Sequence, residues 1–253
     1  DSKCMGKCMM DDAQLAAHLA DKAGELLLAI QTSGEFEGKE LGKVGDVQAN
    51  ALLIEALKTE RPDDAILSEE EKDNLKRLNS ERVWIIDPLD GTREYGEGRT
   101  DWAVHVALAI DGKAAVGAVA LPGLKITLCS DPASVVPPAN DPLKMLVSRT
   151  RPAKEAVAAA EQLEAELLPM GSAGAKAMAV VRGEADIYLH SGGQFEWDNC
   201  APVAVAQAAG LHCSRIDGAP MRYNNEDTYL PDLLICRKEH AQQILDIVAD
   251  LPA

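Results

Sequence analysis

Helical and strand patterns alternate along the whole chain, and this order constrains the fold more than any other feature of the sequence. Apolar residues at helical spacing predict helices at residues 11–32, 46–60, 152–167, 174–182, 198–209 and 239–249. Runs of β-branched and apolar residues predict strands at residues 65–67, 83–86, 102–110, 114–121, 126–129, 144–147, 185–189 and 233–236. Because no internal repeat accompanies this alternation, the sequence predicts an α/β fold in which helices pack in layers on sheets.

The stretch DPASVVPPANDP, at residues 131–142, is a proline-rich break between the two halves of this pattern. A chain of 253 residues, of which 47% are hydrophobic, can bury one large core or two medium ones. We therefore expect two subdomains, an α+β subdomain at residues 1–135 and an α/β subdomain at residues 136–253.

The formal net charge of −16 argues against binding of nucleic acid or of an anionic membrane surface, because both require clusters of Lys and Arg. No apolar run approaches the length of about 20 residues that spans a bilayer. The N-terminal DSKCMGKCMM does not resemble a secretory signal, and its Cys4 and Cys8 lack a second pair that would complete a zinc site. The six cysteines are scattered through the chain, which favours buried thiols in a reducing compartment and hence a cytoplasmic protein.

The predicted strand at residues 83–86 runs directly into the sequence DPLDGT, which contains Asp87 and Asp90. A tight turn explains the proline and the glycine of this sequence, but it does not explain two carboxylates at the end of a hydrophobic strand. Carboxylate and carbonyl oxygens are the hard ligands that magnesium prefers, and a shared cation would relieve the repulsion between neighbouring acids.

Further acids lie at similar places. Glu69 and Glu70 follow a predicted strand, whereas Asp46 and Asp198 stand where we expect helices to begin. Taken singly, each has a structural explanation, because Asp is a common helix N-cap and a run of Glu is usually a solvated surface. The histidines, including His105, lie in apolar contexts that favour a place in the core or on the surface over metal ligation.

Together, the sequences SEE, WIIDPLDGT and WDNCAPVAVAQAAG occur in an order that resembles the inositol monophosphatase superfamily of magnesium-dependent, lithium-sensitive phosphatases. The resemblance extends from about residue 15 to residue 247 and implies five layers in the order α-β-α-β-α. Within the superfamily, DPLDGTREY, KVGDVQAN and SRT are similar to bacterial 3′-phosphoadenosine-5′-phosphate phosphatases of the CysQ type. Ser191 stands where inositol monophosphatases place an acid that holds inositol, and this departure argues against inositol 1-phosphate.

The resemblance also implies roles for the residues at matching positions. Glu69, Asp87 and the carbonyl of Leu89 would hold a first magnesium ion, and Asp87, Asp90 and Asp198 a second, with a third, weaker ion near Glu69. Thr92, supported by Asp46, would orient the attacking water, so the implied catalytic residues are Asp46, Glu69 and Thr92. The implied contacts to the substrate are Glu69, Leu89, Asp90, Gly91, Thr92, Arg149, Ser172, Lys176 and Asp198.

Substrate selection is expected to depend on the second half of the chain, where the resemblance places a lysine of bisphosphate-type members at Lys176. This lysine could bind a second phosphate, and Arg149, Arg151, Ser172 and His190 are further candidates. Each of these side chains could equally be an ordinary solvated one, because Lys and Arg are common on surfaces.

We therefore expect a phosphatase that hydrolyses 3′-phosphoadenosine 5′-phosphate to AMP and phosphate. One alternative is an inositol monophosphatase or fructose-1,6-bisphosphatase on the same fold, because a fold does not determine its substrate. Another, from a different class, is a non-catalytic protein that binds cations or nucleotides. A homodimer is compatible with the resemblance, since dimers are common in the family.

Overall fold

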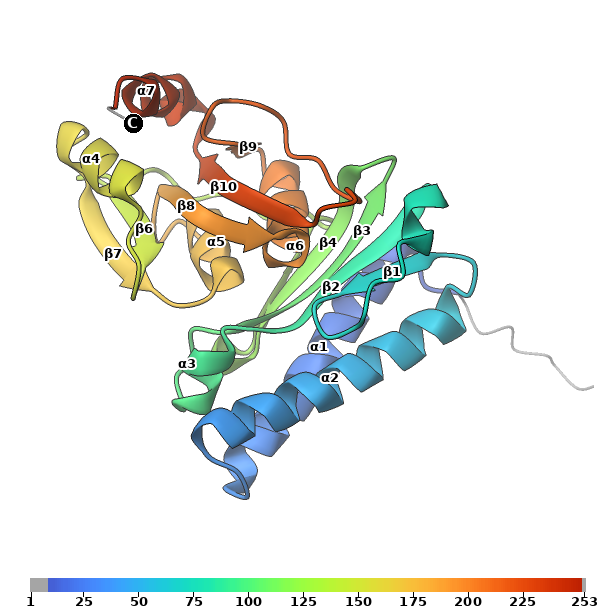
Figure 1. Cartoon of the computed structure of the whole chain (residues 1–253). Helices are drawn as coiled ribbons and strands as arrows, with labels where there is room; N and C mark the ends of the chain where they lie inside the picture. The colour runs from blue at the N-terminus through green and yellow to red at the C-terminus, as the bar shows by residue number, and fades with distance from the viewer. Residues whose placement is uncertain (1–8, 252–253) are drawn as a thin grey trace, which may run out of the picture.

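The computed structural model describes residues 9–251, which form two five-stranded sheets and seven α-helices (Figure 1). The N-terminal sheet consists of β1 (Ala65–Ser68), β2 (Arg82–Asp90), β3 (Ala103–Ile110), β4 (Lys113–Leu121) and β5 (Ile126–Cys129). The C-terminal sheet consists of β6 (Lys144–Ser148), β7 (Glu166–Met170), β8 (Ile187–Phe195), β9 (His212–Ser214) and β10 (Tyr229–Cys236). The helices are α1 (Asp12–Ser33), α2 (Gly38–Glu60), α3 (Thr92–Gly96), α4 (Lys154–Gln162), α5 (Ala173–Val181), α6 (Glu196–Ala208) and α7 (Lys238–Ala249).

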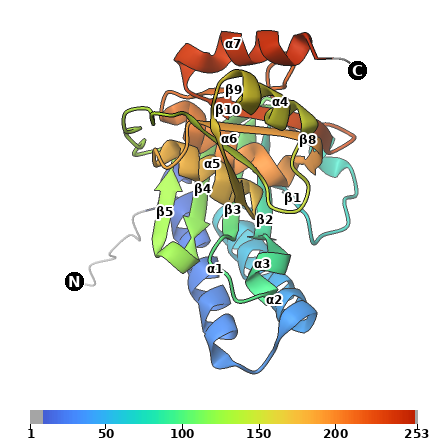
Figure 2. The ribbon, with the colours of Figure 1, turned by 90° about the vertical axis from the view of Figure 1, so that its left-hand side faces the viewer.

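The elements stack in five layers. Helices α1 and α2 cover one face of the N-terminal sheet, and α5 and α6 lie between its other face and the C-terminal sheet. Helices α4 and α7 cover the outer face of the C-terminal sheet, as Figure 2 shows at the top of the molecule. Three clusters of buried apolar side chains fill the boundaries between these layers, and one of them surrounds α5 and α6 between the two sheets. The expected α-β-α-β-α order is confirmed.

Both sheets are mixed. The N-terminal sheet has the strand order β1-β2-β3-β4-β5, with β1 parallel to β2 and the remaining neighbours antiparallel. The C-terminal sheet has the order β7-β6-β8-β10-β9 and is parallel from β7 to β8. The first sheet is built entirely before residue 130 and the second after residue 143, while the exact boundary at 135/136 stays a prediction.

Helix α2 begins eight residues earlier than the sequence predicted, at Gly38 instead of Asp46. Its first two turns, GKELGKVG, contain three glycines, whose low helix propensity made this segment look like a loop. Tertiary packing overrides this preference, because α2 packs against α3 and a side chain at Gly42 would collide with Thr92. Asp46 therefore lies in the body of the helix and does not cap it.

Helix α6 also begins before the expected residue, at Glu196, so Asp198 occupies its first turn and not its N-cap. The Asp198 carboxylate nevertheless satisfies a backbone donor, because it accepts a hydrogen bond of 2.6 Å from the N–H of Phe195.

The helix predicted at residues 152–167 is too long. In the structure α4 ends at Gln162, and Glu166–Met170 forms strand β7. Strand β7 contains Pro169, which cannot donate to a ladder, and it occupies the sheet edge where it pairs with β6 alone. Strand β10 begins at Tyr229 instead of residue 233, and the short strand β9 was not expected.

The remaining expectations on the described chain concern caps, cysteines and membrane spans. Asp11 caps α1 through a hydrogen bond of 2.8 Å from the N–H of Gln14. The described cysteines are free thiols, at positions 129, 200, 213 and 236, whereas Cys4 and Cys8 lie outside the described residues. Between residues 9 and 251, no helix combines the length and the apolar character needed to cross a bilayer.

Candidate active site

Three aspartates from two halves of the chain meet at one point. Asp87 and Asp90 lie at the end of β2, where the pairing with β3 shifts register between them, and Asp198 comes from the first turn of α6. One carboxylate oxygen of each residue lies within 4.8 Å of the others. Asp87 and Asp90 are buried and Asp198 is half-buried, so the three charges face each other largely out of water.

Two further acids predicted from the sequence lie beside this cluster. Glu69 directly follows β1, and its carboxyl is in hydrogen-bond contact with that of Asp87. Asp46 projects from α2 toward Thr92 at the start of α3, and the Thr92 hydroxyl is in hydrogen-bond contact with it. The same hydroxyl lies 3.1 Å from the carbonyl oxygen of Leu89, so two acceptors compete for one proton.

Gly91 makes the turn from β2 into α3. It has φ 90° and ψ 41°, a left-handed conformation that a side chain would strain. Its Cα also lies in a crowded place, because an added Cβ would come within 3.2 Å of Ser172. The expected platform, a buried strand that ends in acids and a tight glycine turn, is therefore present.

Most of these acids resist ionisation. Burial, with the charges of Glu69 and Asp90, raises the pKa of Asp87 well above its ordinary value. Burial and the charge of Asp90 raise the pKa of Asp198 to about 7. Burial, Glu70 and Glu69 likewise raise the pKa of Asp46 to about 7. A cluster of hard oxygen donors that lacks a counter-charge is suited to divalent cations, so the residues present fit a metal centre.

Asp90 is the exception among the acids. Burial alone would raise its pKa, but contacts with His105, Ser172 and the backbone of Gly174 lower it to about 2. The buried His105 lies on β3 with its Nε2 3.1 Å from Asp90 Oδ2, and its Nδ1 lies 2.8 Å from the carbonyl oxygen of Trp197. Burial would lower the pKa of His105, but the charge of Asp90 and this carbonyl raise it above its ordinary value.

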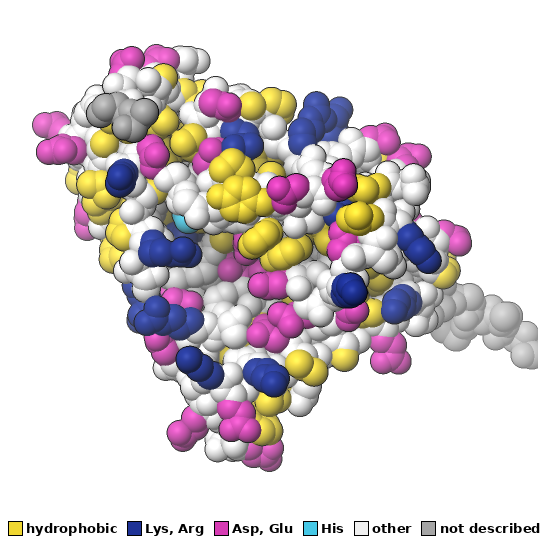
Figure 3. Space-filling view, in the orientation of Figure 1, with side chains coloured by type: hydrophobic (Ala, Val, Ile, Leu, Met, Phe, Trp, Pro, Cys, Tyr) yellow, Lys and Arg dark blue, Asp and Glu magenta, His cyan; other side chains and the backbone are white. Residues whose placement is uncertain are grey.

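A cavity of about 270 Å³ opens next to the acids, between α3, the end of β6 and the start of α5. Figure 3 shows acidic side chains gathered around the hollow in the middle of this face, with Lys and Arg along its left edge. The cavity is lined by three acids, Asp90, Glu94 and Asp198, and by cationic or polar groups: Arg93, Arg149, Arg151, Ser172, Lys176, His190 and Gln194. A ligand in it would meet both negative and positive charge.

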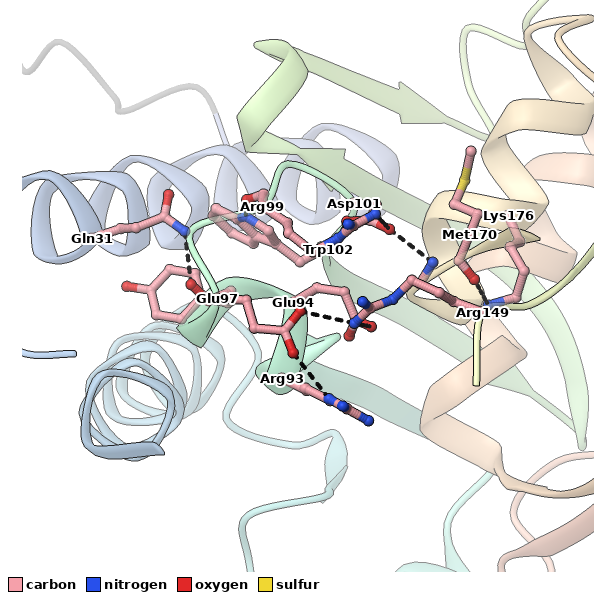
Figure 4. A network of polar contacts seen from close by, with 12 residues as sticks. Gln31, Arg93, Glu94, Glu97, Arg99, Asp101, Trp102, Arg149, Met170 and Lys176 are labelled. Atoms are coloured by element: carbon pink, nitrogen blue, oxygen red, sulfur yellow. Dashed lines mark hydrogen bonds and ion pairs between the residues drawn. The ribbon is translucent and has the colours of Figure 1, made fainter. Parts of the chain in front are cut away.

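Lys176 and Arg149 already have partners within the protein (Figure 4). The buried ammonium of Lys176 donates to the carbonyl oxygens of Ser172, at 2.8 Å, and Met170, at 3.2 Å, and burial lowers its pKa. Arg149 Nη2 lies 2.9 Å from carboxylate oxygens of both Glu94 and Glu97. Lys176 still has a third donor, and the Arg149 guanidinium is held by two carboxylates at Nη2 while its buried Nε has no partner among the described residues.

The sequence matches known proteins along nearly its whole length. A sequence model described as "Inositol monophosphatase family" matches residues 8–252. The chain belongs to the inositol monophosphatase family. Among curated members of this family branch, the 3′-phosphoadenosine 5′-phosphate phosphatase of Mycobacterium leprae is 48% identical over 257 residues, covering 96% of this chain and 95% of that protein. The 3′(2′),5′-bisphosphate nucleotidase CysQ of Salmonella typhimurium is 31% identical over 232 residues, covering 84% of this chain and 94% of that protein.

Solved structures of the inositol monophosphatase family agree with the fold. CysQ from Bacteroides thetaiotaomicron aligns with a TM-score of 0.78 at 24% identity and covers 89% of this chain and 97% of that one. At this level of identity the likeness concerns the fold alone, and the arrangement of layers described above is that of the family.

The structure adds three residues that the sequence reasoning missed at this family site. His105 was expected in the core or on the surface, and it is indeed buried, but it contacts Asp90. Its position could have been noticed, because it is the single polar residue in the strand AVHVALAI and pairs with Asp87 across the sheet. Glu94 and Asp101, which contact Arg149 and the N–H of Gly171, carried no comparable signal.

Proposed function

We propose that this chain is a magnesium-dependent phosphomonoesterase that hydrolyses 3′-phosphoadenosine 5′-phosphate to AMP and inorganic phosphate. The observation that carries the proposal is the cavity beside the acid cluster, which is lined by Asp90 and Asp198 and also by Lys176 and Arg151. This substrate carries its two phosphates on the 3′ and 5′ oxygens of one ribose. A cavity lined by both acids and cations offers a cation-dependent place for one phosphate and a cationic place for the other. The names of the relatives at 48% and 31% identity support the same substrate.

The metal ions would be held by the acid cluster. Glu69, Asp87 and the carbonyl of Leu89 would hold one magnesium ion, Asp87, Asp90 and Asp198 would hold a second, and a third would lie near Glu69. Bound there, such ions lower the pKa of an attacking water and stabilise the charge on the leaving oxygen. The raised pKa values of Asp87 and Asp198 support this role, because burial and the neighbouring carboxylates disfavour their charged forms and a bound cation would relieve this.

The attacking water would be oriented by Thr92. Its hydroxyl can donate to Asp46 or to the Leu89 carbonyl, so its lone pair is directed by one of these contacts. In the reaction, the water oxygen forms a bond to phosphorus as the bond from phosphorus to the ribose 3′ oxygen breaks. The ribose oxygen takes up a proton, and the products are AMP and phosphate.

The rest of the substrate would be held along the cavity. The N–H groups of Gly91 and Thr92 are proposed donors to the scissile phosphate, and Lys176 is the proposed ligand of the 5′-phosphate through its remaining donor. Arg151 lines the cavity, is exposed and forms no ion pair with a described residue, so it is available to the same phosphate. Arg149 and Ser172 were expected to assist, but their contacts with Glu94 and Asp90 favour other roles.

We also propose a cytoplasmic location, and the proposed function is compatible with a homodimer. Free thiols at the described cysteines are compatible with a reducing compartment.

The test is phosphate release with magnesium from 3′-phosphoadenosine 5′-phosphate, inositol 1-phosphate and fructose 1,6-bisphosphate, compared side by side. We expect the nucleotide to lead by about 100-fold or more in kcat/KM, which corresponds to about 2.7 kcal/mol of transition-state preference. Equal or better use of the other two substrates would reject the nucleotide assignment and favour a broader sugar or inositol phosphatase. Absence of phosphate release from all three would favour a binding protein.

One contact is relevant to the inositol alternative. Ser191, which replaces the acid expected in inositol monophosphatases, donates a hydrogen bond of 2.5 Å to Glu155 of α4. Glu155 is engaged with Ser191 and does not line the cavity, so it does not replace the missing inositol ligand.

A further inference from the structure

One oxygen of Asp90 is held from both halves of the chain. Asp90 Oδ2 accepts a hydrogen bond of 2.5 Å from the Ser172 hydroxyl and one of 2.7 Å from the N–H of Gly174. His105 Nε2 lies 3.1 Å from the same oxygen. Among the described residues, no donor reaches the other oxygen, Oδ1, so one side of the carboxylate is fully engaged and the other is open.

Ser172 adopts an unusual backbone conformation to make this contact. Its φ is 59° and its ψ is 130°, outside the regions that residues with a side chain normally occupy. Such a conformation is strained and persists only where surrounding contacts enforce it. Here the Ser172 carbonyl accepts from Lys176, and its Oγ also accepts from the N–H of Ala175, at 3.0 Å.

Helix capping does not by itself require this conformation. Asp11 caps α1 with a side-chain hydrogen bond of the same kind, and its φ of −67° and ψ of 172° are ordinary extended values. Ser172 differs from Asp11 because its hydroxyl also donates to a buried carboxylate in another part of the fold. The strain at Ser172 therefore accompanies the contact with Asp90.

Gly174 allows α5 to come close enough. A Cβ at this residue would lie 2.1 Å from Nε2 of His105, so no other residue fits between the helix and β3. The preceding turn is fastened as well, because the N–H of Gly171 donates to Asp101 Oδ2 at 2.8 Å. These contacts therefore hold the start of α5 close to the end of β2.

We propose that Ser172 is a positioning residue for Asp90, and not a ligand of the substrate. Its hydroxyl, with the N–H of Gly174, fixes Oδ2 and leaves Oδ1 without a donor among the described residues, so that Oδ1 can bind a divalent cation shared with Asp87 and Asp198. Outer contacts of this kind orient a ligand before the metal arrives, and their loss typically weakens metal binding about 10- to 100-fold. The inference rests on the metal-binding part of the proposed function but not on the identity of its substrate.

The test compares Ser172→Ala and Ser172→Gly in the full chain by calorimetric titration with magnesium chloride, without substrate. Both variants lose the hydroxyl, but glycine relieves the positive φ whereas alanine retains it. We expect both to bind magnesium about tenfold or more weakly than the unmodified protein. We also expect Ser172→Gly to unfold at a higher temperature than Ser172→Ala in the absence of metal.

Asp11→Ala is the matched control, because it removes a helix cap of the same kind far from the acids. It should lower the unfolding temperature and leave the affinity for magnesium unchanged. Unchanged magnesium affinity in both Ser172 variants, with a raised KM for the nucleotide, would overturn the proposal and make Ser172 a substrate ligand. Failure of the unmodified protein to bind magnesium would also overturn it, whereas use of a different phosphate ester would reject only the proposed substrate.

Discussion

Arg149 and Glu94 join the two halves of the chain across the mouth of the cavity. Arg149 Nη2, at the end of β6, lies 2.9 Å from Oε1 of Glu94 in α3, and the same nitrogen lies 2.9 Å from Glu97 Oε2 (Figure 4). Glu94 is buried, so its carboxylate depends on this partner. The sequence suggested that Arg149 contacts phosphate. In the structure, Arg149 instead forms an ion pair that links the two halves of the chain.

Arg149→Met is expected to lower the midpoint of thermal unfolding, because it leaves the buried Glu94 carboxylate without its partner. Adding Glu94→Gln should recover part of the loss, since a neutral amide tolerates burial better. The measurement is thermal unfolding of the unmodified protein, both single variants and the double variant. An unchanged midpoint combined with a higher KM for the nucleotide would instead support Arg149 as a phosphate ligand.

Asp90→Asn should reduce turnover by about a hundredfold or more while the protein stays folded. The change removes a carboxylate of the acid cluster, and metal ions in such sites supply several kcal/mol of transition-state stabilisation. Steady-state phosphate release, with circular dichroism as the check on folding, measures this. Asp63 is exposed, so Asp63→Asn is a control with the same chemical change and should be fully active. Near-normal turnover of Asp90→Asn would contradict the two-metal arrangement.

Lys176→Met should reduce kcat/KM for 3′-phosphoadenosine 5′-phosphate about tenfold or more, because a charge-assisted hydrogen bond to the 5′-phosphate is lost. A monophosphate substrate such as inositol 1-phosphate lacks this group and should lose less. Because Lys176 also donates to carbonyls of Met170 and Ser172, the unfolding temperature must be measured in parallel. Equal losses for both substrates would assign Lys176 to the structure of α5 and not to substrate selection.

Magnesium should stabilise the protein more at about pH 8 than at about pH 5.5. Burial and neighbouring charges raise the pKa values of Asp46 and Asp198 to about 7 in the metal-free protein. An acid whose pKa is raised on folding favours the folded state below its unfolded pKa of about 4, and this advantage is lost as the pH rises toward 7. Cations bind the ionised carboxylates, so their effect grows over the same range.

The measurement is the unfolding temperature with and without millimolar magnesium at the two pH values. Asp198→Asn has one titrating carboxylate fewer. In this variant, the rise in unfolding temperature caused by magnesium should differ less between the two pH values. A magnesium effect that is equal at both pH values would show that Asp198 is not among the groups that bind magnesium.

Asp186→Asn should destabilise the fold by about 3 kcal/mol or more, because it breaks a buried ion pair. Asp186 is fully buried, its Oδ1 lies 2.9 Å from Nε of Arg237, and it also accepts from the N–H groups of Asn140 and Lys144. Burial would raise the pKa of Asp186, but these contacts lower it. Its stabilisation is therefore present above the unfolded pKa and is lost as the pH falls through the lower folded value.

Urea unfolding of the unmodified protein and of Asp186→Asn at neutral pH measures the difference in their free energies of unfolding. This difference should narrow as the pH is lowered below about 4, where Asp186 begins to be protonated in the unfolded chain. A small difference in the free energy of unfolding at neutral pH would indicate that the hydrogen bonds retained by asparagine provide most of the stabilisation by Asp186.

The acids of the site were predicted from local sequence, whereas their partners were not. Asp87 and Asp90 could be recognised because a hydrophobic strand that ends in two carboxylates needs an explanation, and Asp198 because it lies in a sequence typical of the family. His105 and Ser172 come from elements that are adjacent to Asp90 only in space. Their contacts follow from strand register and from the approach of α5, which no local pattern encodes.

The sequence by itself determined the type and order of most elements, the acidic character of the site and the family to which the chain belongs. These features depend on periodicity, turn chemistry and short motifs, which act over a few residues. Only the tertiary structure decided where α2 begins and that residues 166–170 form an edge strand. It also decided that Arg149 is paired with Glu94 and that Asp90 is held by Ser172. Each of these depends on packing between distant segments, because burial and hydrogen bonding outweigh local preferences of less than about 1 kcal/mol per residue.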